Sequence, residues 1–108
     1  MRFEIVLAPG AVRALEALGA RRRAEVKDAI ETYLRHEPGK VSRSRIKRLR
    51  GVSRPQFRLR VGDDIRVFYD LSAEAVEVLA IVTKEEALEW LEKEGTPDEE
   101  GGAGQGEG

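Results

Sequence analysis

The chain has 108 residues, 41% of them apolar and 36% charged, with a formal net charge of −1. This length allows one compact core and excludes two. The absence of Cys excludes a disulfide framework and thiolate chemistry, and no apolar run is long enough to span a membrane, so a cytoplasmic protein is expected.

The near-zero net charge hides two segments of opposite sign. Residues 1–84 hold 18 Lys or Arg against 11 Asp or Glu, whereas residues 85–108 hold one Lys against nine acids. The positive charge is densest over residues 40–62, where nine Lys or Arg precede the first acid, Asp63. The body of the protein is therefore expected to have a positive field that suits an anionic partner.

The first part of the chain has the pattern of a strand followed by two helices. Apolar side chains alternate over residues 3–7, and a Pro-Gly pair then ends the strand. Apolar residues recur at helical spacing over residues 12–18, where Gly19 is expected to cap the helix in the left-handed conformation. A second amphipathic helix is built on residues 26–34 and is stopped at Pro38.

From Pro55 onward the period changes to two. Residues 56–61 and 65–70 alternate between apolar and polar side chains, as in an antiparallel hairpin closed by Gly-Asp-Asp. Residues 75–82 are apolar on both faces at most positions, which is typical of a central strand. Thr83 then begins a capping box for a short amphipathic helix.

This order predicts an α+β fold. It consists of an N-terminal strand at the sheet edge, a two-helix hairpin, a three-stranded antiparallel meander and a short C-terminal helix, with the two long helices on one face. The basic stretch Lys40–Arg54 is expected to be a connector beside the sheet. Residues 1–94 are expected to form the domain and residues 95–108 a flexible acidic, Gly-rich tail, because that segment lacks the apolar side chains that favour ordering.

The hairpin register can be predicted from parity. A three-residue loop pairs Val61 with Ile65 and Arg60 with Arg66, and it puts Arg58, Arg60 and Arg66 on the face away from the two long helices. Like charges directly opposite one another on a strand pair are unfavourable. An anion or an acidic partner would relieve this repulsion; alternatively, the arginines are solvated and their stems cover apolar surface.

Two segments carry a family resemblance. IKRLRGVSRPQFRLRVGDDIRVFYD (Ile46–Asp70), followed by VEVLAIVTKEEALEW, resembles the RelE/ParE superfamily of toxins from bacterial and archaeal toxin–antitoxin modules. The resemblance covers about residues 2–93. It implies a RelE/ParE-like fold and, in the favoured RelE-like branch, a toxin that enters the ribosomal A site, cleaves messenger RNA (mRNA) without metal or cofactor, and is neutralised by a cognate antitoxin.

The resemblance also implies a set of site residues. The family's basic positions on the sheet match Arg58 and Arg66, while Glu85 stands where the family has an Arg and Leu91 falls near its terminal Tyr. Lys84 and Trp90 lie beside these two positions. The candidate catalytic residues are Arg58, Arg66 and Lys84. The candidate RNA-binding residues are Lys40, Arg43, Arg45, Lys47, Arg48, Arg50, Arg54, Arg60 and Trp90.

Other functions stay open at this point. The implied partners are an antitoxin, the ribosome and mRNA, and no membrane. Within the same family, a ParE-like branch inhibits DNA gyrase by protein contacts, and a non-catalytic member would bind RNA or antitoxin through its charge alone. Trp90 either offers a stacking surface for a base or packs on the body of the protein.

Overall fold

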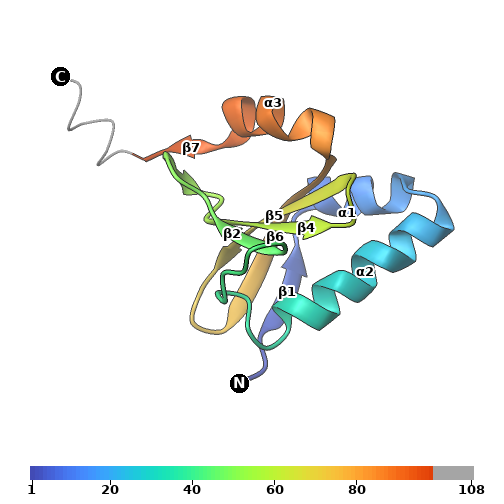
Figure 1. Ribbon diagram of the computed structural model, residues 1–108, viewed down its shortest axis with the longest axis horizontal. Helices are drawn as coiled ribbons and strands as arrows, with labels where there is room; N and C mark the ends of the chain where they lie inside the picture. Colours follow the sequence, from blue (N-terminus) through green and yellow to red (C-terminus); the bar gives the residue numbers. More distant parts are fainter. Residues whose placement is uncertain (99–108) are drawn as a thin grey trace.

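The computed structural model describes residues 1–98 as a sheet with helices on both of its faces (Figure 1). The elements in chain order are β1 (Glu4–Leu7), α1 (Pro9–Ala17), α2 (Ala20–Leu34), β2 (Ile46–Arg48), β3 (Val52–Arg54), β4 (Phe57–Val61), β5 (Ile65–Leu71), β6 (Ala75–Thr83), α3 (Lys84–Glu94) and β7 (Thr96–Pro97). The predicted α+β class, the N-terminal strand, the helix pair, the meander and the C-terminal helix are confirmed.

The main sheet has the strand order β1-β6-β5-β4-β2. β1 lies at one edge and runs parallel to β6, while the other neighbours are antiparallel. The predicted register of the hairpin is confirmed, because Val61 pairs with Ile65 and Arg60 with Arg66. The strand predicted to be central, β6, has a neighbour on each side.

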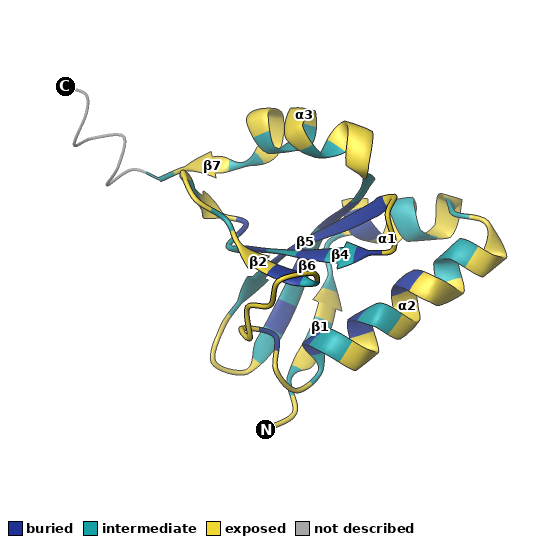
Figure 2. Ribbon diagram, viewed as in Figure 1, coloured by how far each residue is buried: buried dark blue, intermediate teal, exposed yellow. Residues whose placement is uncertain are grey.

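One face of the sheet packs against α1 and α2 and forms the core (Figure 2). The apolar side chains of α2 that recur every four residues, Val26, Ile30 and Leu34, are all buried there. They meet the inward side chains of the sheet, such as Leu59 and Val67, which are both 0% exposed. The alternation in β4, buried at every second residue, follows from this single covered face.

The expected left-handed cap at Gly19 is wrong. Leu18 ends α1 in an extended conformation, and Gly19, with φ of −61°, is the N-cap of α2. The reason is a tertiary contact: the Arg23 guanidinium donates to the carbonyl oxygens of Leu15 and Leu18 at 3.3 and 2.7 Å. A cation that satisfies the last carbonyls of α1 also interacts favourably with the helix dipole, so no left-handed residue is needed.

The expected connector over Lys40–Arg54 is wrong in part, because it contains two short strands. β2 is the edge strand of the main sheet, and its Ile46 pairs with Leu59 of β4. β3 pairs with β7, which lies just after α3. Residues 96 and 97 of the predicted tail therefore take part in a strand pair, and residues 99–108 of that tail lie outside the described residues.

Candidate nucleic-acid interface

The sheet face opposite α1 and α2 carries a cluster of cations. Arg58 pairs with Lys47 of β2 on one side, and Arg60 pairs with Arg66 of β5. Because side chains alternate along each strand and Leu59 and Val67 point into the core, these four cations share the other face. We call this surface, made of Lys47, Arg58, Arg60 and Arg66, the arginine face.

Arg58 is the least satisfied member of the arginine face. It is half-buried, and its Nε atom is buried with no hydrogen-bond partner among residues 1–98. Burial, together with repulsion from Arg66 and Arg60, lowers the pKa of the Arg58 guanidinium. A buried donor without an acceptor is unfavourable, and an anion placed against this guanidinium would offset the repulsion from Arg60 and Arg66.

Arg66 and Arg60 both interact with the turn between β4 and β5. Arg66 is only 8% exposed, and its Nη1 donates to the carbonyl oxygens of Asp63 and Ile65 at 3.1 and 3.0 Å. Arg60 donates to a carboxylate oxygen of Asp63 at 2.7 Å, although the Asp63 side chain is 88% exposed and this ion pair is therefore weak. Arg66 thus holds the turn as well as contributing charge. Its replacement therefore changes both the conformation of the turn and the charge of the arginine face.

The third helix covers part of the arginine face. α3 lies on the opposite side of the sheet from α2 (Figure 1), and its Trp90 ring stacks on Phe68 with centroids 5.2 Å apart and planes 9° apart. Phe68 is 1% exposed. Of the two roles considered for Trp90, packing on the body is therefore the one seen in this structure.

Phe68 was not among the candidate residues, yet it fixes the position of α3. The signal was present in the sequence, because Phe68 alternates with the inward residues of β5 and so falls on the polar face. A large aromatic side chain at such a position indicates a covering element, which here is α3.

Lys84 lies at the start of α3, beside the turn that Arg60 and Arg66 contact. Its backbone N–H donates to the carbonyl oxygen of Asp64 at 2.6 Å, and its side chain is exposed. A carboxylate oxygen of Asp64 also forms an ion pair with Nη2 of Arg22 on α2, at 2.8 Å. The helix start is fixed by the expected capping box between Thr83 and Glu86.

Several other candidate residues point elsewhere. The guanidinium carbon of Arg48 lies 5.1 Å from the centroid of the Phe57 ring, and that of Arg45 lies 5.1 Å from the centroid of the Tyr33 ring. Both contacts are on the α2 side of the sheet. Arg54 forms ion pairs with Asp70 at 2.8 Å and with a second carboxylate, that of Glu77, at 3.4 Å. The remaining three, Lys40, Arg43 and Arg50, are exposed in the loops before and after β2.

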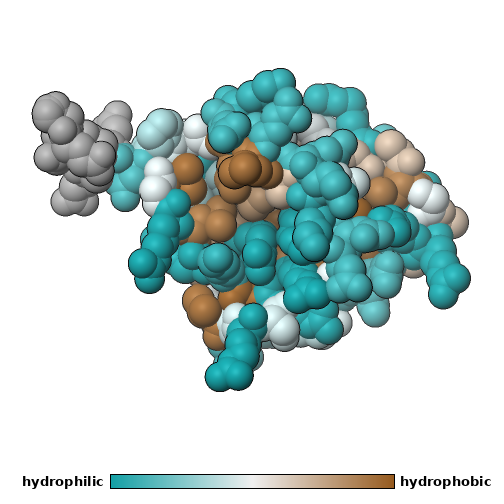
Figure 3. All heavy atoms as spheres, turned by 45° about the horizontal axis from the view of Figure 1, so that its top comes forward, coloured by the Kyte–Doolittle hydropathy of each residue, from teal (hydrophilic) through white to brown (hydrophobic). Residues whose placement is uncertain are grey.

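The side of the molecule that carries α3 is largely hydrophilic (Figure 3). Apolar side chains gather in the middle of this view and hydrophilic ones surround them. Within residues 1–98, no group of three or more His, Cys, Asp or Glu side chains is placed to hold a metal ion, and no helix is both long and apolar enough to cross a membrane. The arginine face itself presents cations beside the stack of Phe68 and Trp90.

Comparison with solved structures places this geometry in a known fold. A chain of the toxin–antitoxin complex RelBE2 from Mycobacterium tuberculosis matches with a TM-score of 0.61 and 24% identity, over 78% of this chain and 100% of that one. A chain of the archaeal RelE–RelB complex from Pyrococcus horikoshii matches with a TM-score of 0.55 and 24% identity, over 78% and 97%. The chain has the RelE-like toxin fold.

A further match extends the RelE-like fold to a more distant sequence. A chain of the Escherichia coli DinJ–YafQ toxin–antitoxin complex has a TM-score of 0.60 at 15% identity, over 82% of this chain and 97% of that one. No protein-family model and no curated protein sequence matches this chain. At these identities the likeness concerns the fold, so what the arginine face does has to be argued from its own residues.

Proposed function

We propose that this chain is the toxin of a toxin–antitoxin module and that it binds RNA through the arginine face. Two lines of support meet here: the three solved structures described above are toxin–antitoxin complexes, and the sheet face that α3 covers in part carries four clustered cations. The observation that carries the proposal is the strand register, which sets Arg60 directly opposite Arg66 and places Arg58 on the same face. A phosphate bound against these cations would offset the repulsion between like charges.

The activity that we propose is cleavage of mRNA on the ribosome. In this reaction the ribose 2′-hydroxyl loses its proton to a base and attacks the adjacent phosphorus. The bond to the 5′-oxygen breaks, and that oxygen takes up a proton, which leaves a cyclic phosphate and a 5′-hydroxyl. Negative charge accumulates on the phosphoryl oxygens during this step, and Arg58 and Arg66, with Lys84 at the rim, would stabilise it.

The proposed partners follow from the same charge. A cognate antitoxin would neutralise the toxin in the cytoplasm by presenting carboxylates to the arginine face, which would also offset the repulsion among its arginines. Such binding and RNA binding would exclude each other, because both use the same guanidinium groups.

One observation favours a second candidate function. Glu85 stands in the first turn of α3, where the family resemblance calls for a cation, and Trp90 is held in its stack with Phe68. A toxin that lacks the Arg and the Tyr implied by the resemblance would inhibit its target by protein contacts alone, as a ParE-like inhibitor of DNA gyrase does, or would bind RNA without cutting it.

A single induction experiment separates these functions. The wild-type protein and Arg58→Gln are expressed in a bacterial host, and protein synthesis is measured by incorporation of radiolabelled amino acids. Primer extension on a translated message and plasmid supercoiling are measured in parallel. Arg21→Gln is the matched control, because Arg21 is exposed on α2 and lies outside the arginine face.

The expected result is a rapid halt of translation with new 5′ ends inside reading frames, lost in Arg58→Gln and retained in Arg21→Gln. Loss of supercoiling with intact messages would assign the protein to the gyrase inhibitors. If the wild-type protein halts neither process, the toxin proposal is wrong. Arg58 is preferred over Arg66 for this test because Arg66 also holds the turn carbonyls.

A further inference from the structure

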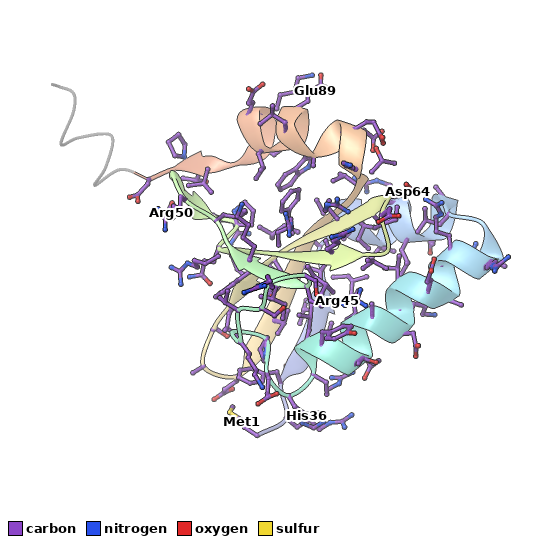
Figure 4. The ribbon with its side chains drawn as sticks, in the orientation of Figure 1. Met1, His36, Arg45, Arg50, Asp64 and Glu89 are labelled. Atoms are coloured by element: carbon purple, nitrogen blue, oxygen red, sulfur yellow. The ribbon has the colours of Figure 1, made fainter. Side chains whose placement is uncertain are left out.

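A groove of about 390 Å³ lies between the end of α2 and the segment that links α2 to β2. Tyr33 lines it from α2, and Ile46 lines it from β2. The linking segment contributes His36, Glu37, Lys40 and Arg45. The groove is separate from the arginine face, because Tyr33 and Ile46 lie on the α2 side of the sheet. Figure 4 shows Arg45 between the sheet and α2, and His36 near the N-terminus of the chain.

The outer wall of this groove is a preformed structure, although residues 35–45 form no helix or strand. The hydroxyl of the buried Tyr69 donates to the carbonyl oxygen of Pro38 at 2.6 Å and so ties the segment to the core. Further along, the Ser42 hydroxyl oxygen accepts from the backbone N–H groups of Arg45 and Ile46, both at 3.1 Å. The cations of the wall are therefore presented by a fixed backbone, which lowers the entropy lost when a ligand binds.

The charges of the groove are mostly uncompensated. No carboxylate of residues 1–98 lies within ion-pair distance of Arg45, whose guanidinium carbon sits 5.1 Å from the centroid of the Tyr33 ring. Lys40 has only Glu37 at 3.8 Å, and both side chains are about 70% exposed, so this pair is weak. An aromatic ring and a guanidinium plane, with a second cation nearby, provide stacking for a base and charge for a phosphate.

The groove and the arginine face lie on opposite sides of the edge strand β2, which is short. The backbone N–H of Arg60 donates to the carbonyl oxygen of Arg45 at 2.8 Å, and Lys47 follows two residues later on the arginine face. Neighbouring strands are about 4.8 Å apart, so a polynucleotide leaving Arg58 crosses roughly 10 Å to pass the edge strand β2. A few further nucleotides would therefore reach Arg45 on the other side of β2.

We infer that this groove is a second RNA subsite, which holds one nucleotide of the strand that the arginine face binds. The base stacks on the Tyr33 and Arg45 pair, and the phosphate lies against Arg45 and Lys40. The inference rests on the proposed RNA-binding function of the arginine face and extends it to a defined path around β2. A single strand is required, because a duplex cannot offer an unstacked base.

Binding of short RNAs of two lengths tests the inference. Oligonucleotides about 4 and about 10 nucleotides long span the site sizes of small single-strand-binding domains. They carry 2′-O-methyl groups so that the nucleophile of the cleavage reaction is blocked, and a fluorophore so that anisotropy reports affinity at low salt. The full chain is compared with Arg45→Gln, Tyr33→Leu, Arg58→Gln and the control Arg21→Gln.

The groove variants Arg45→Gln and Tyr33→Leu are expected to bind the longer RNA at least about fivefold more weakly and the shorter one within about twofold of wild type. Arg58→Gln is expected to weaken both. Because Tyr33 also packs against the core, a second measurement uses the wild-type protein: a 5-iodouridine near one end of the longer RNA is expected to cross-link to Tyr33, as read by mass spectrometry.

Three results would overturn the subsite. If the groove variants bind the longer RNA as tightly as wild type does and Arg58→Gln does not bind it, RNA binding belongs to the arginine face alone. Equal losses for both lengths would place Arg45 within the arginine-face site. Binding of a free mononucleotide that Arg45→Gln abolishes, with no effect of RNA length, would assign the groove to a small ligand. If the wild-type protein binds neither RNA, the proposed RNA-binding function is wrong together with the subsite. Failure of the subsite alone is distinguished by retained binding of RNA to the wild-type protein.

Discussion

Arg58 is expected to strengthen RNA binding and to destabilise the folded protein. The substitution Arg58→Met tests both effects. Methionine keeps an unbranched apolar stem that ends near the position of Nε, and it removes the guanidinium with its charge and the Nε donor. That donor is buried without an acceptor among residues 1–98 and lies beside two further guanidinium groups. Arg58→Met should therefore raise the free energy of unfolding while it lowers affinity for RNA.

The magnitude follows from the burial of a single donor. An unsatisfied buried donor costs about 1–3 kcal/mol. Arg58 is only half-buried, so solvent screens its repulsion by Arg60 and Arg66 and the lower end of that range applies. We expect a gain of about 1 kcal/mol, which raises the melting temperature by about 4 °C in a domain of this size.

Urea denaturation and anisotropy with single-stranded RNA measure the two sides of this prediction. Affinity should fall by about tenfold, as for the loss of one charge-assisted phosphate contact. Arg21→Met is the control, and its stability should stay within about 0.5 kcal/mol of wild type. If Arg58→Met is less stable than wild type by about 1 kcal/mol or more, Arg58 is a structural residue and the reasoning that assigns it to an anion is refuted.

Further predictions concern the anchors of the groove and of α3, and the salt dependence of binding. Tyr69→Phe should lower the free energy of unfolding by about 1–2 kcal/mol in urea, because the Pro38 carbonyl loses a buried donor; an unchanged midpoint would mean that water replaces the hydroxyl. Trp90→Ala should lower the free energy of unfolding by about 2 kcal/mol, which is less than for the loss of a fully buried aromatic side chain, and should speed hydrogen exchange in α3. Exchange at the wild-type rate would show that the Phe68 stack does not hold the helix. Affinity for an RNA of about 4 nucleotides, which contacts the arginine face alone, should fall with salt at a logarithmic slope of about −3 from its four cations, and a slope near zero would exclude phosphate contacts.

The parts of the fold that could be predicted are those with a strong local signal. Val61 and Ile65 flank a three-residue turn, and only one register keeps both on the core face, so parity alone fixed the pairing of β4 with β5. β2 gave no such signal, because Ile46 is the only apolar residue in a three-residue strand. The link between α1 and α2 depends on Arg23, whose role comes from a contact formed only after the two helices have packed.

In the candidate site, the face on which the arginines lie could be predicted from the sequence, but their partners could not. Alternation placed Arg58, Arg60 and Arg66 on one face, and the strand pairing agrees. Charge density could not show which basic residues have acidic or aromatic partners far along the sequence. Arg54 meets carboxylates 16 and 23 residues away, and Arg45 lies over the ring of a residue on α2.

These partners change what the run of positive charge means. Asp63 and the pair of carboxylates at Arg54 compensate part of it within the protein itself, so the density of Lys and Arg overstates the charge that a ligand meets. The set without an ion pair among residues 1–98 includes Arg58 and Lys47 on one face of the sheet and Arg45 on the other. A strand of phosphates that follows this set must bend around the edge of the sheet. The shape of the uncompensated charge, and not its amount, therefore favours a flexible single strand over a rigid duplex as the ligand.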